Sequence, residues 1–150
     1  MRIRPCREAD LPALLDVFYR TVHTACAGDY TPAQLSAWAP ETPDTARWVE
    51  KLRQETFLAA EGGGALLGFG ALEGAYLDLL YVLPDCQGRG VGSALCGFLE
   101  HLCPESRITV HASRTARPFF EAQGYRLVRS QQVERQGIML ENFVLEKDLA

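Results

Sequence analysis

The spacing of apolar residues in the first third of the chain indicates helices rather than strands. Between Leu11 and Val22 they recur every three to four positions, which predicts an amphipathic helix from Ala9 to about Gly28. The segment Thr31–Gln34 combines a capping threonine, a proline and a glutamine, which predicts the start of a short second helix. Residues 44–54 are predicted to form a third short helix.

From Thr56 the pattern changes to the alternation that is typical of strands. Three successive strands are followed by a helix, a strand, a second helix and a final strand pair around Gly137. The predicted strands are 2–4, 56–61, 66–73, 76–83, 107–112, 125–134 and 138–147, and the later helices are 90–103 and 113–123. This order predicts an α/β fold with a mixed, largely antiparallel central sheet of about seven strands flanked by helices.

Composition and charge narrow the class of protein. The chain has 150 residues, 47% of them apolar, without a repeat or linker, so we expect a single domain over 1–150. Its formal net charge of −4 argues against nucleic acid binding, which needs a basic surface. The sequence shows neither a leader segment nor an apolar run of about 18 residues, so we expect no membrane partner. Five scattered cysteines and three distant histidines favour free thiols in a reducing cytoplasm and no metal site.

A glycine-rich turn between a predicted strand and a predicted helix is the most informative segment. Gly88, Gly90 and Gly92 follow the strand that ends at Pro84. They leave backbone N–H groups uncovered at the helix start, and together with the helix dipole and Arg89 these form an anion site that suits a pyrophosphate. The alternative is a turn that only tightens the connection. The spacing fits neither a P-loop, which needs a lysine, nor the dinucleotide fingerprint.

The run Gln87–Gly92 resembles the Gln/Arg-x-x-Gly-x-Gly/Ala signature of the GCN5-related N-acetyltransferases. Residues 110–125 resemble the second half of that family's core. The segment Tyr30–Trp38, with the later Ala-Ser and Pro-Phe-Phe-Glu pattern, is similar to its YafP-like branch. The resemblance implies the acyl-CoA N-acyltransferase fold and an acetyl-CoA-dependent enzyme. It implies transfer of the acetyl group of acetyl-CoA to a primary amine of a small molecule or protein by direct attack.

The resemblance also implies a set of cofactor contacts. Strand backbone groups would bind the pantetheine arm, and N–H groups of the glycine turn would bind the pyrophosphate. Two phenylalanines would line the thioester end. The implied cofactor-binding residues are Leu80, Tyr81, Val82, Gln87, Gly88, Arg89, Gly90, Val91, Gly92, Ser93, Ser113, Ala116, Phe119 and Phe120. Phe120 departs from the family, because many relatives carry there the tyrosine that protonates the leaving thiolate. Ser113 stands in place of an asparagine and is also a candidate helix cap.

Asp78 is the first candidate for the general base. By strand alternation it shares a face with Tyr76, Leu80 and Val82, and it lies between two leucines on a strand that we expect to be central. An ordinary ion pair or an edge charge is the alternative interpretation.

His23, at the end of the first helix, is the second candidate base, although a surface or core histidine is the alternative. The thiolate acid stays open between Tyr125, Tyr81, a water and the substrate ammonium. In the family, the segment around Tyr30 and Trp38 varies most, so both residues are candidates for the wall of the acceptor site. Trp38 could instead anchor the core.

Two other functions stay open at this point. A non-catalytic acyl-CoA-binding regulatory module is kept open by Phe120, and a nucleotide-binding interaction domain by the glycine turn alone. The resemblance implies that a homodimer across the last strands is possible. The acceptor amine cannot be deduced from these residues.

Overall fold

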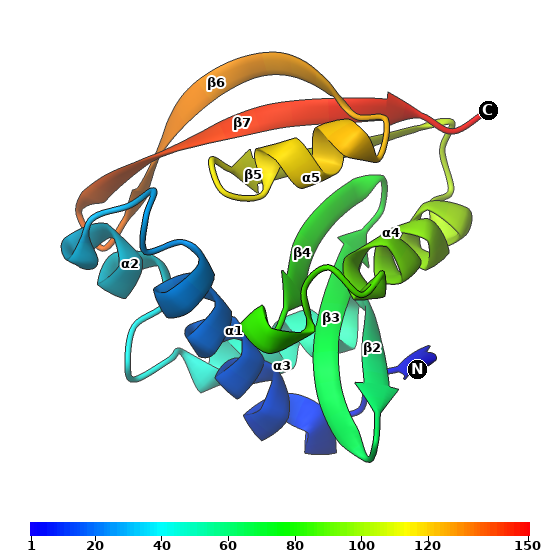
Figure 1. The fold of residues 1–150 in the computed structure, drawn as a ribbon, viewed down its shortest axis with the longest axis horizontal. Helices are drawn as coiled ribbons and strands as arrows, with labels where there is room; N and C mark the ends of the chain where they lie inside the picture. Colours follow the sequence, from blue (N-terminus) through cyan, green and yellow to red (C-terminus); the bar gives the residue numbers. More distant parts are fainter.

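Seven strands form one mixed sheet in a computed structural model that describes residues 1–150 (Figure 1). They are β1 (Arg2–Pro5), β2 (Thr56–Gly62), β3 (Ala65–Glu73), β4 (Tyr76–Val82), β5 (Arg107–Ser113), β6 (Arg126–Arg135) and β7 (Ile138–Asp148), in the order β1-β2-β3-β4-β5-β7-β6. Every neighbouring pair is antiparallel except β4 and β5, which are parallel. The predicted mixed, largely antiparallel sheet is therefore confirmed.

The sheet divides the core into two halves, and helices cover the half on each face. The helices are α1 (Leu11–Ala25), α2 (Pro32–Trp38), α3 (Thr45–Gln54), α4 (Val91–Leu102) and α5 (Arg117–Ala122), with short 3-10 turns at Glu8–Asp10 and Pro84–Cys86. Leu14 and Phe69 are fully buried in the half beneath α1 and α3, and Leu95 and Leu145 in the half beneath α4. Each such side chain contributes roughly 1.5–3 kcal/mol of apolar burial.

The predicted boundary between the strand 107–112 and the helix 113–123 is wrong. The strand continues through Ser113, because Ser113 still pairs with Asn142 of β7. The helix begins only at Arg117, after a turn in which the Ser113 hydroxyl accepts the Ala116 N–H at 3.0 Å. Ser113 therefore caps the turn that leads into α5 rather than the helix itself.

An extra residue in β4 breaks the alternation of its side chains. The register with β3 pairs Ala71 with Leu79 and then Leu72 with Leu77, which leaves Asp78 without a partner. Such a β-bulge places two residues of one strand opposite one residue of the other and turns the following side chains.

The predicted face of Asp78, shared with Tyr76, Leu80 and Val82, is consequently wrong for the last two. Leu80 and Val82 pack in the half of the core beneath α4. The Asp78 carboxylate instead reaches Lys51 on α3, on the opposite face of the sheet.

β4 and β5 run side by side only briefly. Their ladder comprises the pairs Tyr76 with Thr109 and Leu77 with Val110. Beyond them the strands diverge, and Figure 1 shows β2–β4 separated from the part of the sheet formed by β5–β7. The backbone of β4 from Asp78 to Val82 therefore has no strand partner on its β5 side.

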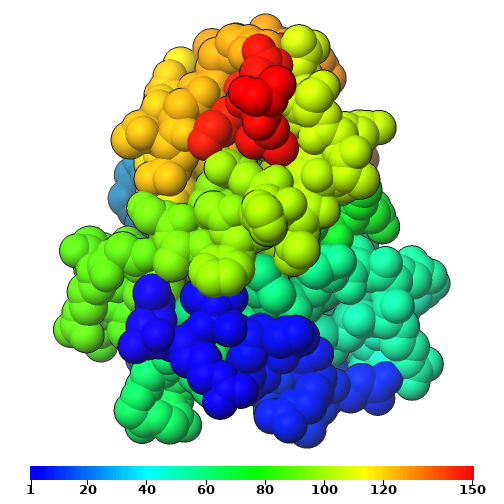
Figure 2. All heavy atoms as spheres, turned by 90° about the vertical axis from the view of Figure 1, so that its right-hand side faces the viewer, coloured from blue at the N-terminus to red at the C-terminus, as the bar shows by residue number.

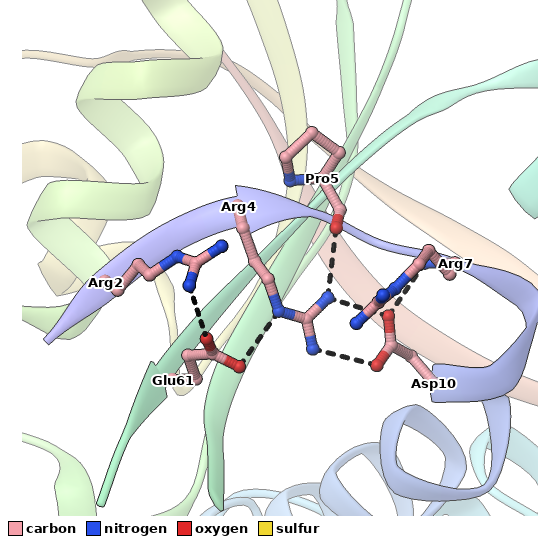
Figure 3. Close-up of polar contacts among 6 residues, drawn as sticks. All are labelled: Arg2, Arg4, Pro5, Arg7, Asp10 and Glu61. Carbon is pink, nitrogen blue, oxygen red and sulfur yellow. Dashed lines mark hydrogen bonds and ion pairs between the residues drawn. The ribbon is translucent and has the colours of Figure 1, made fainter. Parts of the chain in front are cut away.

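Arg4 joins the edge strand β1 to β2 and to the turn before α1 (Figure 3). Its guanidinium donates to Glu61 at 2.9 Å and to both carboxylate oxygens of Asp10 at 2.9 Å. This bidentate pair lowers the pKa of Asp10 to about 2. Asp10 also accepts the Arg7 N–H at 2.7 Å, so one network determines where α1 begins. Figure 2 shows both chain ends on one side of the molecule, with the yellow-green part that contains α4 between them.

Candidate functional site

A cavity of about 510 Å³ opens where β4 and β5 diverge, between α1, the glycine turn and α5. Most of the predicted cofactor-binding residues line it, namely Leu80, Tyr81, Val82, Gln87, Gly88, Gly90, Gly92, Ser93, Ser113, Ala116, Phe119 and Phe120. Arg89 and Val91 do not. Arg89 is exposed, whereas Val91 is buried in the core beneath α4 because the helix turns its side chain inward. We refer to this cavity as the cleft.

The glycine turn has the backbone geometry of an anion site. Gly88 and Gly90 have φ values of +77° and +81°, in the left-handed region that favours glycine. Gly90 is the N-cap of α4, and no side chain caps the helix there. The first N–H groups of α4 therefore remain available at the positive end of the helix dipole. The Gln87 amide ties the turn to β4 by donating to the Val82 carbonyl at 3.1 Å.

The two phenylalanines of α5 pack differently. A Cβ atom at Gly92 would lie 3.2 Å from the Phe119 ring, so the glycine allows α4 and α5 to approach closely. Phe120 is 3% exposed and packs edge-on against Tyr125, with ring centroids 5.2 Å apart. Phe120 lines the cleft but carries no proton to donate.

Thr21 of α1 is a residue of the cleft that the sequence did not predict. Its hydroxyl donates to the Val82 carbonyl at 3.1 Å. The residue is buried, at 6% exposed. The available signal in the sequence was a threonine within the apolar stripe of the helix. The hydrogen bond of Thr21 fixes α1 to the end of β4.

A second cavity of about 480 Å³ lies beside the cleft, between α3, the loop before it and the β6–β7 hairpin. Five residues line both cavities, namely Trp38, Asp78, Tyr81, His111 and Ser113. We call this set the junction. A group bound in the cleft and a group bound in the second cavity meet at these side chains.

Asp78 lies at the junction, but it does not act alone. Its Oδ2 atom is 2.6 Å from Nζ of Lys51, which is also 3.4 Å from Oε2 of Glu55. The Glu55 side chain is 2% exposed, and its Oε1 atom is buried without a hydrogen-bond partner. Burial and the neighbouring Asp78 raise the pKa of Glu55 to about 7. The sequence did not predict this trio, because Lys51 and Glu55 have the spacing of an ordinary helix-surface ion pair.

His111 is the one residue of the junction that the sequence left without a role. Its ring packs edge-on against Tyr76, with centroids 5.0 Å apart, and its Nδ1 lies 3.3 Å from the Gln131 amide nitrogen. Burial, followed by the charges of Arg129 and Arg135, lowers the pKa of His111. The imidazole is therefore neutral at neutral pH.

The structure does not bring His23 and Tyr125 into either cavity. His23 packs on Tyr19 and its Nε2 lies 2.7 Å from the Ala39 carbonyl, since this side of α1 faces the loop after α2. Tyr125 is buried beneath α4 and donates to Glu100 at 2.8 Å. We correct both predictions and assign neither residue a catalytic role.

Tyr30 and Trp38 both line the second cavity, as expected for an acceptor wall. The Tyr30 hydroxyl donates to the Glu141 carbonyl at 2.7 Å and accepts the Arg114 N–H at 2.9 Å, so it also holds the loop before α2 on β7. Trp38 Nε1 donates to the Tyr81 hydroxyl at 3.3 Å.

Burial raises the pKa of Tyr81 well above its usual value. Tyr81 therefore keeps its proton at the junction. Its hydroxyl accepts a hydrogen bond from the indole of Trp38 and donates to no protein acceptor, so that proton can serve a bound group.

Three further observations concern the whole chain. No group of three or more His, Cys, Asp and Glu side chains is arranged to hold a metal ion. All five cysteines are free thiols. The fold contains no helix whose length and apolar character would let it cross a membrane.

Comparison with known proteins gives consistent matches. Residues 26–147 match the model of a family described as acetyltransferase (GNAT) domain. The chain is 38% identical over 145 residues to the uncharacterized N-acetyltransferase YafP of Escherichia coli K12, covering 97% of this chain and 94% of YafP.

Two solved structures resemble the fold. One is a GCN5-related N-acetyltransferase of Rhodopseudomonas palustris, also named "Aminotransferase, Class-II", with a TM-score of 0.95 and 33% identity over 99% of this chain and 95% of that one. The other is the PaiA N-acetyltransferase of Thermoplasma acidophilum in complex with coenzyme A, with a TM-score of 0.80 and 20% identity over 98% of both chains. At this lower identity the likeness concerns the fold alone.

Proposed function

Because the chain belongs to the GNAT family of acetyltransferases, we propose that its two cavities receive the two substrates of an N-acetyl transfer. The chain is an N-acetyltransferase. In our proposal acetyl-CoA lies in the cleft, and a primary amine of a small molecule or protein lies in the second cavity. The observation that carries the proposal is the junction, where five side chains line both cavities.

The cleft suits acetyl-CoA because polar groups of the protein follow one another along the length of the cleft. The uncapped N–H groups of α4 would hold the pyrophosphate, in the segment Gln87–Ser93. The side of β4 from Leu80 to Val82 that has no strand partner would bind the pantetheine arm through backbone groups other than the Val82 carbonyl, which already accepts from Thr21 and Gln87. Phe119 and Phe120 would line the thioester end. Bound acetyl-CoA supplies the activated acetyl group as a thioester.

The residues of the junction would perform the acid–base work. Asp78 would accept a proton from the acceptor ammonium, which must become a neutral amine before it attacks. Tyr81 would supply the proton to the leaving thiolate, since Phe120 cannot. Trp38 and Tyr30 would form the wall against which the acceptor packs.

A non-catalytic acyl-CoA-binding role gains no support from the relatives described above. A reducing, cytoplasmic setting and a homodimer across β6 and β7 stay predictions of the sequence.

The first test is thermal unfolding with acetyl-CoA, with ATP and NAD as controls. A ligand at about 100 times its Kd adds about 2.7 kcal/mol, which corresponds to several degrees for a chain of this size. We expect a shift with acetyl-CoA alone, and a shift with ATP or NAD alone would overturn the assignment of the cleft.

The second test is Asp78→Asn. It should keep this shift and lose about 10²- to 10⁴-fold in acetyl transfer to a panel of probe amines, followed by the released thiol. Full turnover in the variant would remove Asp78 from the role of base.

A further inference from the structure

Glu55 is a buried carboxyl group whose surroundings disfavour its charge. It is the C-cap of α3, at the negative end of the helix dipole. Its side chain is 2% exposed, and Oε1 lies buried without a hydrogen-bond partner. An ionised carboxylate in such a place loses its hydration without full compensation, and a bound proton relieves this cost.

Asp78 adds a second carboxyl group to the same site. One ammonium, that of Lys51, lies between them, 2.6 Å from Asp78 and 3.4 Å from Glu55. If both carboxyls were ionised, the trio would carry a net negative charge within the protein. Both carboxyls contact the same Lys51 ammonium, so the charge of each one disfavours the ionisation of the other.

The groups packed around the trio do not supply a second close cation. Tyr76 lies beside it on β4, and burial raises the pKa of that phenol to about 12, so it stays neutral. His111 on β5 is neutral at neutral pH for the reason given above. Arg135, at the end of β6, faces the second cavity and makes no ion pair with either carboxyl.

We propose that Glu55 and Asp78 share one proton at neutral pH, and that Glu55 is the positioning residue which stores the proton that Asp78 takes from the acceptor. This inference rests on the proposed function, because it assigns the substrate contact to Asp78. Glu55 lines neither cavity and acts only through Asp78 and Lys51.

The step balances as follows. The pair first releases its shared proton to water. The acceptor ammonium then gives one proton to the ionised pair, whose charge falls from −2 to −1. The neutral amine then forms the new C–N bond as the thioester C–S bond breaks. Tyr81 gives its proton to the sulfur and takes up the second proton from the nitrogen, giving the amide and the free thiol. The pair again holds one proton, as at the start.

The test is a ¹³C NMR titration of the side-chain carboxyl groups between pH 4 and pH 9, on the free protein. In the wild type we expect one glutamate carboxyl to titrate near pH 7, and the Asp78 resonance to respond over the same interval. Glu55→Gln should abolish both responses. Glu50→Gln is the matched control, because Glu50 is an exposed glutamate of the same helix that interacts with Gln54.

A second variant keeps the test decisive if Glu55→Gln does not fold. Lys51→Gln removes the only ammonium of the trio, so the shared proton should be held to a higher pH than in the wild type. The inference is overturned if every glutamate carboxyl titrates below pH 5, or if the Asp78 response is the same in wild type and Glu55→Gln.

Kinetics separate this inference from the proposed function. With whichever probe amine turns over, Glu55→Gln should move the acid limb of the kcat/KM profile to lower pH, so that activity at pH 5.5 relative to pH 8 rises by up to about thirtyfold. A merely structural role would lower the rate equally at all pH values. An active Asp78→Asn variant would instead contradict the proposed function, whereas an inactive Asp78→Asn with an unmoved limb in Glu55→Gln contradicts only the shared proton.

Discussion

Replacing Glu55 by glutamine should change how the stability of the protein depends on pH. In the folded state the pKa of Glu55 is raised from 4.5 to about 7. The folded protein therefore binds this proton more tightly than the unfolded chain does, and the stabilising contribution is fully present below about pH 4.5 and lost as the pH rises through 7. The difference of about 2.5 pH units, at about 1.4 kcal/mol each, corresponds to about 3 kcal/mol.

The assay is urea denaturation of the wild type, Glu55→Gln and Glu50→Gln at pH 5 and pH 8. Glutamine keeps the shape of the side chain but does not titrate. The free energy of unfolding of Glu55→Gln should therefore rise relative to the wild type by about 2–3 kcal/mol between the two pH values, since most of the linkage falls in this interval.

Glu50→Gln should follow the wild type, because an exposed carboxylate has similar surroundings in both states. Other titrating groups, such as Asp10, cancel in the comparison between variants. If Glu55→Gln and the wild type lose stability in parallel from pH 5 to pH 8, the carboxyl is ionised in the folded protein and the reasoning fails.

Two further predictions concern the cleft and the buried tyrosine. Gly90→Ala forces a left-handed alanine, at φ +81°, and should cost about 1–2 kcal/mol in urea denaturation. It should weaken acetyl-CoA binding at least tenfold in calorimetric titration, whereas Gly97→Ala, in open space within α4, should raise stability by up to about 1 kcal/mol. Tyr125→Phe removes the donor to Glu100 and should cost about 1–3 kcal/mol while the acetyl-transfer rate is unchanged, so a loss of kcat would restore Tyr125 as a catalytic residue.

The elements of the fold could be predicted because each is encoded locally. The apolar positions from Leu11 to Val22 determine a helix, and the alternation after Thr56 determines strands. The boundary at Ser113 was wrong for a non-local reason. Pairing with Asn142, far along the chain, extends the strand and delays the helix.

The functional site was likewise predictable where it depends on adjacent residues and unpredictable where it depends on distant ones. The glycine turn could be predicted because positive φ values and an uncapped helix start depend on adjacent residues. The face of Asp78 could not, because a bulge depends on the register with β3. The sequence did not predict the shifted pKa values of Glu55 and His111, because these shifts come from burial and from neighbours on other strands and helices.

The brief ladder between β4 and β5 has a consequence for the lifetime of the chain. The two parts of the sheet share two backbone pairing positions there, so a molecule bound between them adds contacts that hold the two parts together. On the proposed function that molecule is a substrate. A ligand that binds only the folded chain reduces the fraction that is open to proteolysis. The supply of acetyl-CoA would then lengthen the lifetime of the enzyme, as well as set how fast it works.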